Sequence, residues 1–172
     1  MNVALPPGST DADWLRAFHA VVPQVLRVHK PTVLVTQHGC DSHRQDPLAD
    51  LNLTVDGQRA SYLAVASLAD ELCAGRWMCT GGGGYSVRNV VPRAWTHLLG
   101  IVSGQPVDPN TPVPESWRAE VGGESAPQTM SDGADASFRP FHEGVTPQSR
   151  VDQAILATRQ AVFPELGIDP SL

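Results

Sequence analysis

A chain of 172 residues, of which 41% are hydrophobic and 17% charged, is long enough for one globular domain with a buried core. Its net charge of −6 and its single lysine, Lys30, argue against a nucleic-acid-binding surface, and no apolar stretch approaches the roughly 20 residues of a membrane span. The three cysteines follow no disulfide framework and the N-terminus carries no signal-peptide pattern, so we expect a cytoplasmic protein.

The first predicted elements are a helix and a strand joined by a short turn. A helix is predicted to begin near Asp11, because Thr10 and Asp13 have capping-box spacing and apolar residues then recur at helical intervals. Pro31 ends this helix, and an apolar run over 32–36 predicts a strand directly afterwards. The chain therefore opens with a helix followed by a buried strand.

The next elements repeat the alternation. Thr54 is a plausible N-cap for a helix over roughly 57–74, and a short apolar strand follows at 77–80. Residues 87–100 are predicted to be helical, with Pro92 near the first turn. This order of elements predicts an α/β fold with a parallel sheet flanked by helices on both faces.

The pattern indicates part of a domain, because only two strands are evident and a buried parallel sheet usually needs more. Residues 1–102 are interpreted as the C-terminal half of an α/β domain whose other strands would lie before Met1. Residues 103–137 are rich in Pro and Gly and are predicted to be irregular. Within 138–172, a helix over roughly 148–162 is expected to dock on the same domain.

The best candidate for a functional carboxylate is Asp41, where the first strand gives way to polar residues at the carboxyl edge of the sheet. A hard carboxylate there suits a divalent metal, but the same residue could instead cap a helix or stabilise a loop. His38, Cys40 and His43 lie nearby, yet their spacing resembles no closed zinc site and strand alternation turns neighbours to opposite faces. A local His/Cys/Asp cluster is therefore disfavoured.

The second strand runs into four glycines, Gly81–Gly84, and then Tyr85. The glycines match no phosphate-binding motif, but they allow a backbone to approach a ligand closely. Tyr85 would then enter a cleft with its hydroxyl free to donate, although a flexible turn with a half-buried tyrosine fits the pattern as well. Because parallel strands end at one edge, we expect Asp41 and Tyr85 to face the same site.

Four blocks of this chain resemble motifs of the histone deacetylase and acetoin-utilisation deacetylase superfamily, in the same order. These blocks are Asn2–Gly8, Gln37–His43, Asp46 with Leu51–Gly57, and Gly81–Asn89. The stretch Val90–Trp95 is similar to the bacterial acetoin-utilisation branch. The resemblance covers residues 2 to about 100 and extends only loosely to the last helix.

The resemblance implies an arginase-like α/β fold and hydrolysis of acetyl-lysine or a related acetylated amine with one catalytic metal, Zn²⁺ or Fe²⁺. By match, Asp41 is similar to a metal ligand of the family. Tyr85 is similar to the tyrosine that hydrogen-bonds the substrate carbonyl and the developing oxyanion, and Gly83 and Gly84 would lie along the acyl-lysine channel.

The resemblance also implies parts that this chain does not match. The family's other two metal ligands come from an Asp-x-His segment and its general base from a His-His pair, and both lie upstream of the loop that Asn2–Gly8 resembles. We therefore predict that the isolated chain is inactive and that activity needs the missing N-terminal half as a partner. The alternatives are a non-catalytic remnant or interaction module of the same fold, and an unrelated α/β binding domain in which Asp41 caps a helix.

Overall fold

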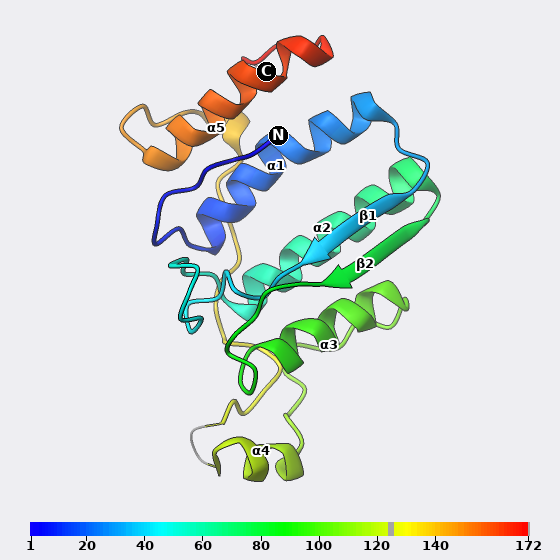
Figure 1. Ribbon diagram of the computed structural model, residues 1–172, viewed down its shortest axis with the longest axis vertical. Coiled ribbons are helices and arrows are strands. Elements are labelled where there is room, and N and C mark those ends of the chain that lie inside the picture. Colours follow the sequence, from blue (N-terminus) through cyan, green and yellow to red (C-terminus); the bar gives the residue numbers. More distant parts are fainter. Residues whose placement is uncertain (124–125, 172) are drawn as a thin grey trace.

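The computed structural model describes residues 1–123 and 126–171, and its elements alternate between helix and strand before a helical C-terminal part (Figure 1). The elements in chain order are α1 (Asp11–His29), β1 (Leu34–His38), α2 (Val55–Cys73), β2 (Trp77–Gly81), α3 (Val91–Val102), α4 (Glu115–Val121), η2 (Phe141–Glu143), α5 (Arg150–Val162) and η3 (Pro164–Leu166).

The two strands form a parallel pair, which confirms the predicted α/β class. Leu34 pairs with Trp77 and His38 pairs with Gly81, so both strands end at the same edge of the sheet. β1 begins two residues later than predicted, where the Leu34 amide first donates to the Arg76 carbonyl at 2.9 Å. Figure 1 shows both arrows pointing toward the loops that follow them. These loops contain the predicted site residues.

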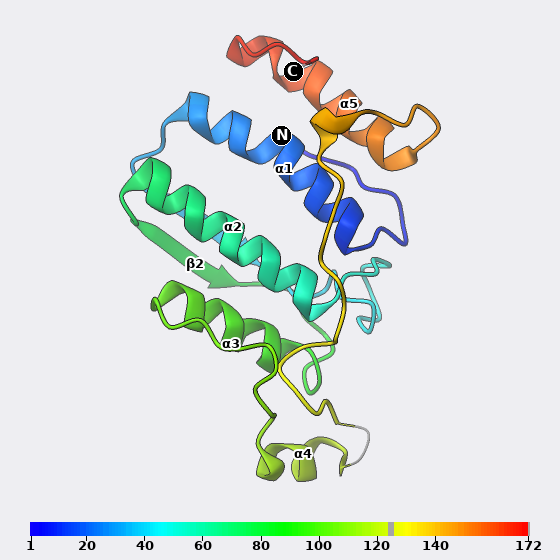
Figure 2. The same cartoon turned by 180° about the vertical axis from the view of Figure 1, so that it is seen from behind.

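The helices of the α/β part lie on one face of the sheet. α2 covers this face, and α1 and α3 flank α2 on either side (Figures 1 and 2). Leu34 packs there against Val65 and Ala69 of α2. On the opposite face, Val35 is 63% exposed and Met78 is 58% exposed. The expectation of helices on both faces is therefore wrong for the residues described, since nothing in those ranges covers the second face.

Two predicted caps fix where α1 and α2 begin. The Thr10 amide and hydroxyl both donate to Asp13 at 2.9 Å, which confirms the capping box. Thr54 accepts from the Gly57 amide at 3.2 Å, which confirms it as the N-cap of α2. Asp11 joins the two helix starts, because its carboxylate accepts from the Thr54 amide and hydroxyl at 2.8 and 2.6 Å. The end of the Asp41 loop is thereby tied to both helices.

α3 starts at Val91, later than predicted, and has Pro92 in its first turn. Leu98 is buried, whereas Leu99 is 69% exposed. The two differ because neighbouring residues on a helix point in directions about 100° apart. The segment 103–137 contains one short helix, α4, in an otherwise irregular path across its described residues.

α5 packs on α1, far along the chain from it. Arg16 donates to both carboxylate oxygens of Asp152, at 2.7 and 2.9 Å, and this ion pair is buried. An apolar cluster surrounds the contact and consists of Ala17, Ala20, Val21, Phe141, Val151, Ile155 and Phe163. The predicted helix over 148–162 is thus observed as α5, capped by the Ser149 hydroxyl. None of the helices within the two described ranges has the length and apolar character needed to cross a bilayer.

Candidate functional site

The loops that follow β1 and β2 are hydrogen-bonded to each other. The Cys40 amide donates to the Gly83 carbonyl at 2.6 Å. On the far side of the first loop, the Asp46 carboxylate accepts from the Tyr85 amide at 2.8 Å. These two bonds hold the loop carrying Asp41 against the glycine-rich loop, at the carboxyl edge of the sheet.

The Asp41 carboxylate lies in a cradle made by two glycines. A β carbon on Gly39 would lie 2.6 Å from Asp41 Oδ1, and one on Gly83 would collide with the same carboxylate. Within residues 1–123 and 126–171, Asp41 makes no hydrogen bond and no ion pair, and the N-cap of α2 is Thr54. The interpretation of Asp41 as a helix cap is therefore wrong, and its half-buried carboxylate has no partner among these residues.

Tyr85 has a fixed backbone and an exposed side chain. The Asp46 carboxylate holds its amide, whereas 54% of the residue is exposed to solvent. The preceding Gly84 has φ +156°, and a β carbon there would lie 2.8 Å from Val91 Cγ2. Only glycine fits this approach, because an L-residue would be strained at that φ and would also clash. The loops thus bring residues 41 and 85 to one edge, and their chemical roles stay predictions.

His38 and Cys40 turn away from Asp41 into the protein interior. His38 Nε2 lies 2.6 Å from Thr36 Oγ1 and its ring packs edge-on against Tyr62, so burial lowers the pKa of this imidazole. Cys40 is 1% exposed, and burial together with the Asp41 charge raises the pKa of its thiol to about 12. A thiol with that pKa stays protonated at neutral pH and is a poor metal ligand.

His43 also leaves the site, although Asp41-Ser42-His43 has Asp-x-His spacing. Its Nε2 lies 2.7 Å from Asp132 Oδ2, and the same oxygen accepts from the Val55 amide at 2.9 Å. Asp132 Oδ1 contacts Arg93 Nη2 at 2.9 Å. Burial alone raises the pKa of the Asp132 carboxyl, but the bonds from His43 and Val55 and the Arg93 charge outweigh it and hold that pKa well below its usual range.

Sequence reasoning missed Asp132 and Arg93. Asp132 lies in the stretch predicted to be irregular, 89 residues from His43, and no motif surrounds it. Arg93 was visible only as part of the stretch Val90–Trp95. A signal did exist in the composition, because a buried helix arginine needs an acceptor and the proline-rich stretch carries several aspartates.

The described residues do not by themselves fit a catalytic metal. Among them, no group of three His, Cys, Asp or Glu side chains lies close enough to hold an ion. A catalytic zinc uses three protein ligands, and Asp41 supplies a single carboxylate. The local cluster of His38, Cys40 and His43 with Asp41, which the spacing disfavoured, is absent from this part of the chain.

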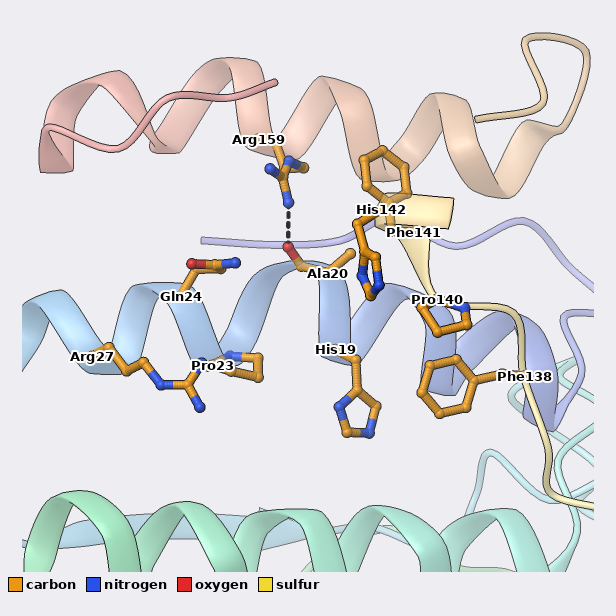
Figure 3. A pocket seen from close by; sticks show the side chains of 10 residues that line it. All are labelled: His19, Ala20, Pro23, Gln24, Arg27, Phe138, Pro140, Phe141, His142 and Arg159. Atoms are coloured by element: carbon orange, nitrogen blue, oxygen red, sulfur yellow. Dashed lines mark hydrogen bonds between the residues drawn. The ribbon is translucent and has the colours of Figure 1, made fainter. Parts of the chain in front are cut away.

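Several cavities border α1, and two of them bear on the site. One of about 210 Å³ borders the end of β1 and is lined in part by His38, Gly39 and Tyr62. The other, of about 310 Å³, lies between α1 and α5 (Figure 3). Figure 3 shows Arg159 reaching from α5 to the Ala20 carbonyl of α1, at 2.7 Å. No predicted site residue lines the larger cavity, so it does not belong to the loops at the sheet edge.

Comparisons with known proteins point to one family. Residues 1–102 match the family described as the histone deacetylase domain. The acetoin utilization protein AcuC of Bacillus subtilis (strain 168) is 31% identical over 137 residues, which are 78% of this chain and 35% of that protein. AcuC of Staphylococcus xylosus is 36% identical over 118 residues, which are 68% of this chain and 30% of that protein.

Among solved structures, the HD domain of HDA15 aligns with a TM-score of 0.49 and 27% identity, over 58% of this chain and 27% of that chain. The chain spans about a third of the length of the curated relatives that it matches, with 35% and 30% of the two AcuC proteins covered.

Proposed function

The chain belongs to the histone deacetylase family, and from that premise we propose that it forms part of a metal-dependent deacetylase. The substrate class is acetyl-lysine or a related small acetylated amine. The observation that carries the proposal is the contact between the two loops, made by the Cys40–Gly83 and Asp46–Tyr85 hydrogen bonds, which joins the two matched blocks bearing Asp41 and Tyr85. The free thiols of the chain fit a cytoplasmic setting.

In this proposal each loop has one chemical task. Asp41 contributes one ligand to the metal, Zn²⁺ or Fe²⁺, because its oxygens have no partner among the described residues. The metal, when bound, supplies polarisation of the amide carbonyl and a more acidic water. Tyr85 donates its hydroxyl to the acyl oxygen, a contribution of about 3–4 kcal/mol to transition-state stabilisation in comparable oxyanion holes. Gly83 and Gly84 would lie along the channel for the acyl-lysine chain.

We further propose that residues outside this chain complete the site. The described residues lack a three-ligand cluster, and a catalytic metal and its attacking water need both further ligands and a proton acceptor. The open face of the sheet, with Val35 and Met78 exposed, offers an apolar surface to the rest of the deacetylase fold. The 172 residues alone are therefore expected not to hydrolyse acetyl-lysine.

The test is a chimera in which this chain replaces the matching stretch of a catalytically active histone deacetylase domain. We expect the chimera to release acetate from an acetyl-lysine peptide, and the chain alone to release none in the same buffer with the same metal. Hydrolysis by the purified chain alone would contradict the need for outside residues. A folded chimera that binds metal without hydrolysing the peptide would instead favour the non-catalytic module.

A further inference from the structure

One buried carboxylate outside the family match contacts the first loop of the candidate site and the helix that follows the second loop. Asp132 lies beyond residues 1–102, and its side chain is 8% exposed. One of its oxygens accepts from His43 Nε2 and the Val55 amide, and the other faces Arg93 Nη2 at 2.9 Å. A carboxylate with partners on both oxygens fixes those partners relative to one another.

In the first loop, the partner of Asp132 is His43, whose two ring nitrogens both have hydrogen-bond partners. The Gln45 amide donates to His43 Nδ1 at 3.0 Å, so the ring proton lies on Nε2 and is donated to Asp132. The His43 amide donates to the Cys40 carbonyl at 3.1 Å, and the Asp46 amide donates to the His43 carbonyl at 2.8 Å. Fixing this ring therefore fixes the turn between Cys40 and Asp46, which carries Asp41.

Beyond the second loop, the partner of Asp132 is Arg93, in the first turn of α3. Arg93 Nε donates to the Asn89 carbonyl at 2.7 Å, and Asn89 lies four residues after Tyr85. Arg93 is 5% exposed, so its guanidinium is buried among these acceptors. The end of the glycine-rich loop is thereby tied through Arg93 to the same carboxylate that holds His43.

The segment that carries Asp132 is itself anchored to α2. Asp56, in the first turn of α2, accepts from the amides of Asp132 and Ala134 at 3.0 Å each. Its other oxygen accepts from the Ser131 hydroxyl at 2.7 Å. The Ser131 carbonyl in turn accepts from Arg93 Nη1 at 3.1 Å. Asp132 is therefore presented from a fixed segment and is not a loose side chain folded onto the site.

From these contacts we infer that Asp132 is a positioning residue that clamps the two loops together. Through His43 it orients the turn that carries Asp41, and through Arg93 it fixes the exit of the loop that carries Tyr85. The chemical consequence of the clamp rests on the proposed deacetylase function, whereas the clamp itself is a property of this chain. The segment after residue 102 thus belongs to the site although the family match stops there.

The first test compares Asp132→Asn with Asp135→Asn by hydrogen exchange in the full chain. Asp135 lies on the same segment and is exposed, and within the described ranges its carboxylate bonds only to Ser137. In the Asp132 variant we expect the Cys40 and Tyr85 amides to lose protection by tenfold or more, while amides in α1 keep theirs. The ¹H and ¹⁵N signals of the His43 Nε2–H group should shift in that variant, because its charged acceptor is lost, and should stay unchanged in the control.

Unchanged protection at Cys40 and Tyr85 in a folded Asp132→Asn protein would overturn the inference. If that variant does not fold, native-state exchange of the unmodified chain in low urea decides the matter. The amides of Cys40, Tyr85 and Val55 should then open together, with one free energy and one urea dependence. Continued protection of Cys40 after Val55 has opened would contradict the clamp.

The second test measures the chimera that carries the whole chain. With the clamp removed by Asp132→Asn, kcat should fall at least tenfold while KM changes less than twofold, because misplaced catalytic groups cost rate more than binding. If the loops lose protection but kcat does not change, the result supports the clamp and contradicts the proposed roles of Asp41 and Tyr85. If the loop amides keep their protection in this variant, the result contradicts the clamp but not the proposed roles of Asp41 and Tyr85.

Discussion

Two aspartates near the same edge of the sheet have opposite surroundings. The Asp132 side chain is 8% exposed and has partners on both carboxylate oxygens, whereas Asp41 has no partner among the described residues. Glycine backbones, Gly39 and Gly83, form the walls around Asp41 and leave its oxygens open. A carboxylate whose oxygens are all hydrogen-bonded stabilises the fold, whereas a carboxylate without such partners can bind a ligand.

The largest effect on stability is expected for Asp132, because both of its carboxylate oxygens have partners. Asp132→Ala should lower the free energy of unfolding by about 3–5 kcal/mol, because the buried Arg93 charge and the His43 N–H lose their acceptor. Urea unfolding followed by circular dichroism measures the change. Asp135→Ala, on the same segment, should leave the midpoint where it is, and equal midpoints for the two variants would refute the contrast.

The glycine cradle gives the next effect. Gly83→Ala should destabilise the protein by about 1–3 kcal/mol, because a β carbon there collides with the Asp41 carboxylate. Combining Gly83→Ala with Asp41→Gly should restore most of the loss. No restoration in that double variant would show that the collision partner is not Asp41.

Acid should weaken the stabilisation that Asp132 provides. The pKa of Asp132 is held below its ordinary value of 3.8, so the unfolded chain binds this proton first as the pH falls. The stabilisation is therefore complete above about pH 4 and is lost as the pH drops toward the lower folded pKa, by at most about 1.4 kcal/mol per pH unit. Urea midpoints between pH 5 and pH 2 should fall more steeply for the wild type than for Asp132→Asn, and parallel profiles would contradict the assignment.

The smallest effect on stability is expected for Asp41, which has no partner among the described residues. Asp41→Ala should change the free energy of unfolding by less than about 0.5 kcal/mol, because no hydrogen bond or ion pair to the described residues is lost. The same urea experiment measures it. A loss comparable to that of Asp132→Ala would mean that Asp41 holds the loop and is not free for a ligand.

Local signals account for what the sequence predicted well. The capping box at Thr10 and Asp13 and the N-cap at Thr54 depend on residues three apart, and both were found where expected. The meeting of the Asp41 loop with the glycine-rich loop followed from a general property of parallel strands, which end at a common edge. The resemblance of four ordered blocks to one family was confirmed by the match of residues 1–102.

Contacts between distant residues account for what the sequence could not predict. Asp132 reaches His43 across 89 residues from a stretch without periodicity, so neither spacing nor propensity marks it. The open face of the sheet was missed because consecutive apolar residues such as Val33–Val35 are typical of a strand that is buried on both faces, yet Val35 is exposed. A contact between distant residues, or an uncovered face of a sheet, can be identified only from the three-dimensional structure.

The central claim is that Asp41 and Tyr85 serve one site, and a double-variant cycle on kcat/KM of the chimera tests it most directly. We expect Tyr85→Phe to lower kcat/KM by about 10²–10³-fold and Asp41→Ala to lower it at least as far. Because groups of one site act as a unit, the double variant should be little worse than Asp41→Ala alone. A Tyr85→Phe or Asp41→Ala chimera that keeps kcat/KM within twofold of the parent would contradict the claim.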